Sequence, residues 1–312
     1  MDLKQLEYFV RVAELGSFTR ASVALGIAQP GLSRQIRLLE VELRQNLLTR
    51  NGRGALPTEA GGLLLQHGRG ILHQVQLARD ALGAVRGALS GRVSLGLPPS
   101  LSRLVTVPLT QAFKTRLPEA QLTLTEGFSM LMHEGLRNGN LDMAVLYNAA
   151  PSPEIEVTSL HVEELVLISK RSVRTAQPPI SLQALAALPL ILPSRPNAFR
   201  ILLDAEMHAI GTAPNITLEV DGLNAILSLV KAGLGHALLP SYTLSHVEDR
   251  AHFMLRRIKS PRITSQLSLV RPTRRPSTQT QRVAFEIVNA VVIQAMEQAT
   301  KQASTQAVKT CR

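Results

Sequence analysis

The fold of the N-terminal part of the chain is decided by one stretch, Ile27-Ala28-Gln29-Pro30-Gly31-Leu32-Ser33-Arg34-Gln35-Ile36-Arg37-Leu38-Leu39-Glu40. Pro30 suits the first turn of a helix, because its missing N–H group would find no partner there in any case. Leu32, Ile36, Leu39 and Leu43 follow one another at steps of four, three and four residues, which puts them on one buried face. The other face carries Pro30, Ser33, Arg34 and Arg37. The stretch therefore predicts an amphipathic helix with a short polar face.

Two shorter helices are predicted before it. The first is indicated by apolar residues at helical spacing, which are Leu3, Leu6, Phe9, Val10 and Ala13. Gly16 ends this helix, Ser17 is a suitable N-cap for a second helix over residues 18–25, and Gly26 closes that one. Two helices joined by a turn of about three residues are typical of a helix-turn-helix. The alternative is an ordinary amphipathic helix with solvated charge, but the succession of signals favours DNA binding.

A basic hairpin is predicted after these helices. Residues 49–54 read Thr-Arg-Asn-Gly-Arg-Gly, and their Asn-Gly pair is a strong signal for a two-residue turn. Such a hairpin would act as a wing that contacts phosphate, while the helix that starts near Gln29 enters the major groove of double-stranded DNA. The candidate DNA contacts are Ser17, Thr19, Arg20, Gln29, Pro30, Ser33, Arg34, Arg37, Arg50 and Arg53.

Length and composition agree with this interpretation. The 312 residues suggest about two domains, and 45% apolar with 18% charged residues is typical of a folded globular protein. The 34 Lys and Arg residues outnumber 23 Asp and Glu residues, and a net charge of +11 favours a polyanionic partner. Aromatic residues are too few for a base-stacking surface of the kind that binds single-stranded RNA.

Several other classes of protein are excluded. The only cysteine, Cys311, rules out an internal disulfide framework, a zinc finger and a CxxC redox site. No apolar run approaches the ~18 residues of a membrane span, and residues 1–5 lack a signal-peptide core, so we expect a cytoplasmic protein without a membrane partner. The chain has no HExxH, GxSxG, Walker A or GxGxxG motif, and its histidines show no metal-ligand spacing. We therefore predict no enzyme activity, no catalytic residue, no metal and no cofactor.

A long helix is predicted from Thr58, as its N-cap, to about Leu89. Its apolar residues alternate at steps of four and three, and these are Ile71, Val75, Ala78, Leu82, Val85 and Leu89. This spacing is the a/d seam of a coiled coil. A lone helix could bury the seam on its own domain, but a seam that lies between two domains favours pairing with a second chain. Ser90-Gly91 is the expected hinge.

The remaining two thirds of the chain alternate short β-rich runs with helical stretches. Strands are predicted over 93–97, 120–126, 141–147, 165–169, 190–192, 216–220 and 236–239, and helices over 102–116, 130–138 and 222–232. Such alternation indicates an α/β fold with parallel sheets. Residues 250–282 hold nine Lys or Arg and no acidic residue, which indicates a solvated basic face or, as the alternative, a second DNA-contacting surface. Residues 303–312 are expected to be disordered.

A ligand site is expected where strands feed helix N-termini, since open α/β sheets bind ligands there. The first candidates are Ser100, Leu101 and Ser102, and the next are Phe128 and Ser129. Arg195 could face them from another part of the fold and pair with a carboxylate. The alternative for each serine is a simple helix cap. A small carboxylate or another small anion is the expected ligand, because free N–H groups and the helix dipole favour negative charge.

The N-terminal sixty residues resemble LysR-type transcriptional regulators. The matching segments are Leu6–Phe9, Gly16–Ala21, Ala28–Pro30, Leu32–Ile36, Leu39-Glu40 and Thr58–Gly61. Leu48 departs from the usual Phe, which is a core change, and Gly31 replaces a common Ala or Ser, which could alter base preference. Residues 122–147 and 188–200 are most similar to the nitrogen-assimilation subgroup.

This resemblance implies a specific domain plan. A winged helix-turn-helix occupies residues 1–58, a dimerisation helix 59–90 and an effector-binding domain 91–312, which is built like periplasmic binding proteins. Its subdomain I spans about 91–162 and 266–300 and its subdomain II about 163–265, with the effector between them. The family's effector contacts match by position at Ser100 and Ser129. The family also implies dimers or tetramers, with RNA polymerase as a candidate partner. The competing function is a small-molecule receptor that does not bind DNA, which the N-terminal segment argues against.

Overall fold

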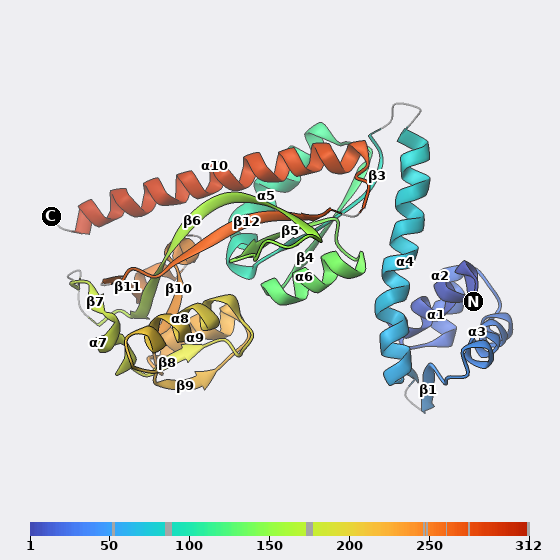
Figure 1. The fold of residues 1–312 in the computed structure, drawn as a ribbon, viewed down its shortest axis with the longest axis horizontal. Coiled ribbons are helices and arrows are strands. Elements are labelled where there is room, and N and C mark those ends of the chain that lie inside the picture. Colours follow the sequence, from blue (N-terminus) through green and yellow to red (C-terminus); the bar gives the residue numbers. More distant parts are fainter. Residues whose placement is uncertain are drawn as a thin grey trace. The chain divides into compact units, whose positions relative to one another are not determined.

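The computed structural model describes residues 1–51, 54–84, 89–172, 177–245, 247, 249–259, 261–273 and 275–310. The chain divides into two compact units, of which the first holds residues 1–88 and 137–140 and the second holds residues 89–136 and 141–312 (Figure 1). In the parts of the chain that are described, no helix is long and apolar enough to cross a membrane.

The first unit contains three short helices, a hairpin and one long helix. These are α1 (Leu3–Leu15), α2 (Phe18–Leu25), α3 (Gln29–Leu43), β1 (Leu48–Asn51), β2 (Gly54–Pro57) and α4 (Glu59–Ala84). Gly16 and Gly26 end α1 and α2 in the left-handed conformation, with φ of 62° and 65°, which glycine adopts without a steric penalty. The predicted helix limits in this segment are therefore confirmed.

The apolar face of α3 forms the centre of this unit. Leu32, Ile36 and Leu39 are all 1% exposed or less, as the spacing predicts. They pack with Phe9 and Val10 of α1 and Phe18 of α2. Leu3 was expected in this core but is 46% exposed, whereas Val12 is buried in its place.

The hairpin packs closely against the turn between α1 and α2. Ala55 N donates to Gly16 O at 2.9 Å, and a Cβ on Gly54 would lie 2.3 Å from the same oxygen. Only glycine fits at position 54, since its φ of 143° also disfavours a side chain. The antiparallel register pairs Leu48 with Pro57 and Asn51 with Gly54.

Helix α4 begins as predicted, with Thr58 as its cap. Thr58 Oγ1 accepts from Gly61 N at 3.0 Å and donates to Asn46 O at 2.7 Å. Apolar side chains remain exposed on this helix, notably Leu82, whose exposed fraction is 74%, and Ile71. Val85 lies outside the described residues, and Leu89 packs against the core of the second unit instead of extending the seam.

The second unit is built on a mixed sheet. Its strand order is β4-β3-β5-β12-β6-β11-β7, with β10 paired to β6, and β8 and β9 form a separate pair. The strands are β3 (Gly91–Leu97), β4 (Ala120–Glu126), β5 (Met143–Tyr147), β6 (Ile155–Lys170), β7 (Ile180–Ser181), β8 (Leu190–Leu192), β9 (Ile216–Glu219), β10 (Ala237–Pro240), β11 (Phe253–Lys259) and β12 (Thr264–Pro272).

The second unit also contains six α-helices among its described residues, most of which follow a strand in the chain. They are α5 (Pro99–Arg116), α6 (Ser129–Asn138), α7 (Leu182–Ala186), α8 (Ala198–Ala209), α9 (Leu223–Ala232) and α10 (Gln279–Thr310), with short 3-10 helices η1 (Ser241–Leu244) and η2 (Arg250–His252). Helix α10 continues through residues 303–310, so the prediction of disorder there was wrong (Figure 1).

The prediction of parallel sheets is correct only in part. Strand β3 pairs in parallel with β4 and β5, whereas β12 is antiparallel to both β5 and β6. The reason is the 16-residue strand β6, which pairs with β12 over residues 155–164 and then with β10 and β11 over 165–170. One long strand thus runs through two lobes, each with its own apolar core.

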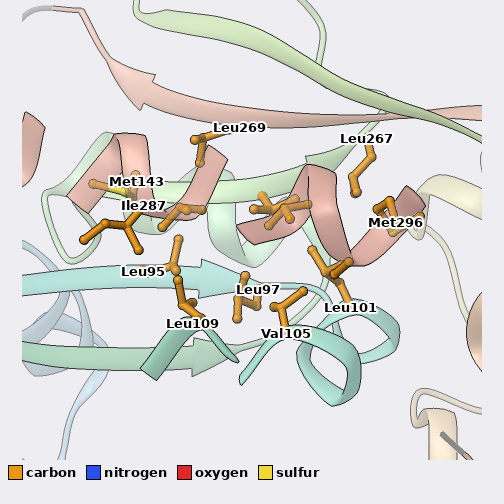
Figure 2. Packing of buried hydrophobic residues seen from close by; sticks show 14 of the residues in the cluster. Leu95, Leu97, Leu101, Val105, Leu109, Met143, Leu267, Leu269, Ile287 and Met296 are labelled. Carbon is orange, nitrogen blue, oxygen red and sulfur yellow. The ribbon is translucent and has the colours of Figure 1, made fainter. Parts of the chain in front are cut away.

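The core of the first lobe lies between its sheet and helices α5 and α10. Leu95 and Leu97 of β3 meet Leu101, Val105 and Leu109 of α5, while Ile287 and Met296 of α10 pack against Leu267 and Leu269 of β12 (Figure 2). The second lobe has cores on both faces of its strands, one around Leu165 and Leu203 and the other around Ile168 and Val230.

Candidate functional site

The polar face of α3 lies beside α2 on the surface of the first unit. Gln29, Pro30, Arg34 and Arg37 are exposed on α3, and Ser33 is half-buried. Thr19 and Arg20 are exposed at the start of α2, and Thr19 Oγ1 donates to Gln29 Oε1 at 3.4 Å. Ser17 Oγ accepts from Arg20 N at 3.3 Å, so this hydroxyl caps α2. The fold therefore brings these predicted DNA contacts together.

Two arginines on this surface are available to a ligand. Among the residues that the structure describes, Arg20 and Arg34 have no acidic partner, whereas Arg37 lies 3.6 Å from Glu40. Helix α3 also begins without a side-chain cap, because its N-cap is Ala28. Exposed guanidinium groups beside an uncapped helix N-terminus suit phosphate and base edges.

The structure describes only part of the predicted wing. The backbone of Arg50 lies in β1, but its side chain is not described, and Arg53 lies outside the described residues. The predicted contacts of these two arginines stay predictions.

A small cavity lies at the centre of the second unit, where helices from both lobes begin. Its volume is about 40 Å³, which is room for about three water molecules. It is lined by Pro98, Pro99, Ser100, Phe128, Ser129, Tyr147, Pro193, Asn197, Ala198, Phe199, Leu223, Ile226 and Leu239. The N-terminal residues of α5, α6, α8 and α9 are among them, so four helix ends with positive partial charge surround the cavity.

Three buried hydroxyl groups form a cluster, and two of the residues that carry them, Ser100 and Tyr147, line this cavity. Ser100 Oγ lies 3.1 Å from both Tyr147 OH and Tyr242 OH, and the two phenol groups also bond to each other. Burial raises the pKa of Tyr147 and the pKa of Tyr242 well above their ordinary values. Both phenols therefore stay protonated, and the cluster offers hydrogen-bond donors to a ligand that accepts them.

The other predicted effector residues differ in their positions. Phe128 and Ser129 line the cavity, and Ser129 Oγ accepts from Tyr147 N at 3.2 Å. Leu101 is not at the cavity but fully buried in the core of the first lobe. Ser102 also faces away from it, because its hydroxyl bonds to Thr106 Oγ1 at 3.2 Å.

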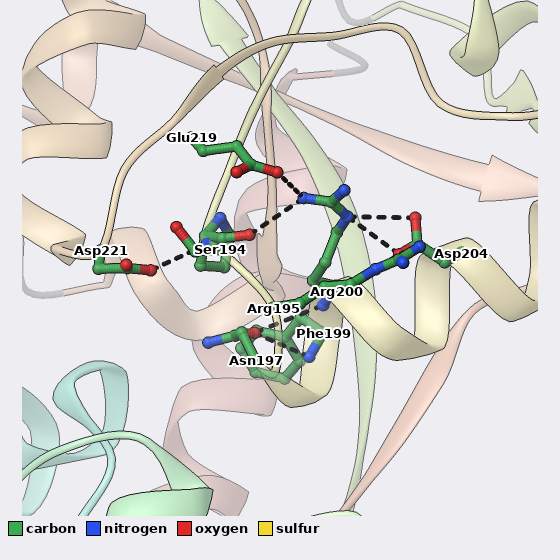
Figure 3. A network of polar contacts seen from close by, with 9 residues as sticks. Ser194, Arg195, Asn197, Phe199, Arg200, Asp204, Glu219 and Asp221 are labelled. Carbon is green, nitrogen blue, oxygen red and sulfur yellow. Dashed lines mark hydrogen bonds and ion pairs between the residues drawn. The ribbon is translucent and has the colours of Figure 1, made fainter.

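Arg195 does not line the cavity in this structure. Its side chain is exposed, and its Nε donates to Asp204 Oδ2 at 2.9 Å (Figure 3). Asp204 also accepts from the buried Arg200 at 3.0 Å, and Arg200 pairs with Glu219 at 2.6 Å. Arg195 therefore pairs with the carboxylate of Asp204, one helical turn after Arg200, and not with the carboxylate of a ligand as predicted.

This arginine network holds the loop that lines one wall of the cavity. Arg200 Nη1 donates to Pro193 O at 3.4 Å, and Asn197 Oδ1 caps α8 by accepting from Phe199 N at 2.9 Å (Figure 3). Ser194 N donates to Asp221 at 2.9 Å, which ties the same loop to the start of α9. These hydrogen bonds therefore hold residues 193–199, which form one wall of the cavity, in place.

A buried carboxylate lies behind the hydroxyl cluster. Glu163 of β6 is 2% exposed and accepts from Ser241 N at 2.9 Å and Ser241 Oγ at 2.7 Å. Desolvation raises the pKa of Glu163 above its ordinary value. Glu163 thereby anchors the start of η1, the element that carries Tyr242 into the hydroxyl cluster.

Sequence reasoning missed both tyrosines. A signal was available, because the chain has only three tyrosines, and two of them follow predicted strands: Tyr147 ends the run 141–147, and Tyr242 comes shortly after 236–239. Strand ends of an open α/β sheet are where such polar groups converge on a ligand.

A helix-turn-helix with exposed cations, joined in one chain to a two-lobed α/β unit with a cavity where helices of both lobes begin, defines a ligand-responsive DNA-binding protein. Two family models match the chain, the "Bacterial regulatory helix-turn-helix protein, lysR family" over residues 3–62 and the "LysR substrate binding domain" over residues 86–292. The chain belongs to the LysR family of transcriptional regulators, which bind DNA, carry an effector-binding domain and are not enzymes.

The most similar relatives include two nitrogen assimilation regulatory proteins called Nac. The chain is 33% identical to that of Escherichia coli strain K12 over 94% of this chain and 95% of the relative. It is 35% identical to that of Klebsiella aerogenes over 86% and 88%, respectively. Among solved structures, full-length CbnR in complex with its target DNA is 26% identical, with a TM-score of 0.69 over 93% of this chain and all of CbnR (100%).

Proposed function

We propose that this LysR-type regulator responds to a small carboxylate or similar anion, which binds in the cavity of the second unit and modulates promoter binding. The observation that carries the proposal is that the first residues of four helices line one cavity together with two hydroxyl groups of the buried cluster, those of Ser100 and Tyr147. Donors and positive helix ends both favour a negatively charged acceptor.

The lining also suggests the shape of the effector. Apolar side chains such as Phe128, Phe199 and Ile226 cover much of the wall. An effector with an apolar body and one acidic group would satisfy both kinds of surface. The cavity of about 40 Å³ is smaller than such a molecule, and we propose that the two lobes separate to admit it. Two states with different ligand contacts are what a population shift needs.

For DNA, we propose that α3 enters the major groove with Gln29, Ser33 and Arg34 at the base edges. Arg20 and Arg37 would contact phosphate, as would Arg50 and Arg53 on the wing. The support for this assignment is the exposure of Arg20 and Arg34 and their freedom from acidic partners within the described chain. The Nac relatives make promoters of nitrogen assimilation genes the first to test.

The proposed plan of the chain is a DNA-binding domain to residue 58, an oligomerisation helix to residue 90 and an effector domain beyond it. The change of strand partner along β6 after Glu164 supports division of that domain near the predicted crossovers, Val162 and Gln266. The exposed apolar side chains of α4, including Leu82, support a dimer or tetramer through this helix.

The effector proposal is tested by a thermal-shift screen of small carboxylates and their neutral amides on the full chain. Calorimetry then compares wild type with Ser100→Ala for any ligand that the screen returns, and we expect weaker binding in the variant with unchanged DNA binding in the absence of ligand. Equal affinities would place the site elsewhere, and a hit list of purely neutral ligands would contradict the anion.

DNA binding is tested separately by gel shift. The operator is selected from a random pool of duplexes, and binding is measured as a function of salt concentration, since phosphate contacts make affinity fall steeply with salt. A chain that selects no duplex would support the competing function, a receptor without DNA binding.

A further inference from the structure

The cavity lining contains hydroxyl, amide and apolar side chains but no Lys, Arg or His. The buried Glu163 acts electrostatically on both tyrosines. The buried cation Arg200, which donates to the lining residue Pro193 O at 3.4 Å, is already paired with Asp204 and Glu219. An anion in this cavity therefore needs a compensating cation that the lining does not supply. Arg195 and Arg200 are both paired with Asp204.

Arg103 lies on α5 close in sequence to residues that line the cavity. It follows the lining residues Pro99 and Ser100 by four and three positions on α5, so all three share one face of the helix. Its side chain is exposed and donates to Asn224 Oδ1, and no acidic residue of the described chain pairs with it. Asn224 directly follows the lining residue Leu223 on α9. The bond thus joins a helix of one lobe to a helix of the other.

The first turns of α5 and α9 flank this contact, and Asp221, which precedes α9, already accepts from Ser194 N. Neither α5 nor α9 has an acidic residue in its first turn, and neither helix has a side-chain cap. A guanidinium close to two positive helix ends is destabilised unless an anion is near. The neutral amide oxygen of Asn224 leaves the charge of Arg103 uncompensated, whereas a carboxylate neutralises it and can accept two parallel bonds from the guanidinium.

We infer that Arg103 is the residue that recognises the charge of the effector, and that Asn224 occupies its guanidinium until an anion replaces the amide. The inference rests on the proposed effector cavity and adds its specificity-determining residue. The Arg103–Asn224 bond then connects the two lobes in the absence of effector, and anion binding replaces it with an ion pair between Arg103 and the effector.

The chain offers a probe that does not depend on knowing the effector. It has no Trp and three Tyr, so in a Tyr8→Phe background all intrinsic emission comes from Tyr147 and Tyr242. Quenching by iodide, a small anion, is compared with quenching by acrylamide, which is neutral, at constant ionic strength. The ratio of the two quenching constants measures how strongly the cavity edge favours an anion.

Substitutions of the two bonded residues, Arg103 and Asn224, should change the quenching ratio in opposite directions. Arg103→Gln removes the cation, and one charge about 6 Å away in screened water changes the local anion concentration about twofold, so the ratio should fall by about that factor. Asn224→Ala frees the guanidinium, so the ratio should rise. Arg103→Lys keeps the charge and should retain most of the wild-type ratio. Arg116→Gln, which removes an exposed charge from the far end of α5, is the matched control and should leave the ratio unchanged.

A structural role alone predicts a different pattern. If the bond only holds the lobes together, Arg103→Gln and Asn224→Ala open the cavity alike and change the ratio in the same direction, which would overturn the inference. A ratio that is equal in all variants would overturn it as well. A ligand screen that returns only neutral molecules would contradict the proposed effector class but not these ratios, so the two failures are distinguishable.

Discussion

Replacing Tyr242 with Phe tests the buried hydroxyl cluster most directly. The ring keeps its place in the core, and only the phenol oxygen is lost. Tyr242 OH bonds to Ser100 Oγ at 3.1 Å and to Tyr147 OH, so two hydrogen bonds disappear. Ser100 Oγ and Tyr147 OH remain 3.1 Å apart and still pair with each other. Because no buried hydroxyl loses all its partners, we expect about 1 kcal/mol for each lost bond, or about 2 kcal/mol in the free energy of unfolding.

Urea unfolding followed by far-UV circular dichroism measures this change. The matched control is Tyr8→Phe, which removes a phenol oxygen from the first unit. Tyr242→Phe should lower the transition of the second unit and leave that of the first in place. For any ligand that accepts from the cluster, one lost donor should weaken binding about fivefold to tenfold in calorimetry.

The same variant has a pH signature. The pKa values of Tyr147 and Tyr242 are raised in the folded protein, so unfolding allows both phenols to ionise near pH 10. Wild-type stability should therefore hold below about pH 10 and fall as the pH rises above it. Tyr242→Phe removes one of the two groups and should make this fall shallower. A variant as stable as wild type with the same alkaline slope would refute the buried cluster, and a loss above about 4 kcal/mol would indicate disrupted packing instead.

Three further predictions concern DNA binding, assembly and the buried carboxylate. Arg34→Ala should lower affinity for a selected operator by about 1–3 kcal/mol in gel shift without changing the fold, with Arg11→Ala, an exposed arginine on α1, as control; unchanged affinity would remove Arg34 from the interface. Leu82→Asp should shift the species seen by light scattering to a smaller oligomer, because it places a charge on the exposed apolar seam of α4, and a wild type that is monomeric at micromolar concentration would contradict the seam. Glu163→Gln keeps an acceptor for Ser241 but removes the titratable carboxyl group. Because the pKa of Glu163 is raised in the folded state, wild-type stability should decrease as the pH rises from about 4 through that folded pKa. Thermal unfolding of the variant should lack this decrease. Identical pH profiles for the two proteins would show that Glu163 does not titrate there.

The sequence alone determined the local elements of this protein. The helix-turn-helix follows from residue spacing and from Gly16 and Gly26, because periodicity and glycine conformation act over a few residues. The alternation of strands and helices after residue 90 likewise determined the α/β class. The positions of Ser100, Phe128 and Ser129 at one cavity were predicted for the same reason, since each follows the end of a predicted strand.

Tertiary structure decided which distant groups meet. Tyr147 and Tyr242 are 95 positions apart, and only the pairing of β6 with both lobes brings their hydroxyl groups to Ser100. The partner of Arg195 is Asp204 rather than an effector, because α8 places that carboxylate within reach of its guanidinium. The antiparallel direction of β12 and the contact of Arg103 with Asn224 could not be predicted from the sequence either. Such pairings depend on the geometry of the whole sheet, whereas spacing in a sequence reports only on neighbours along one helix or strand.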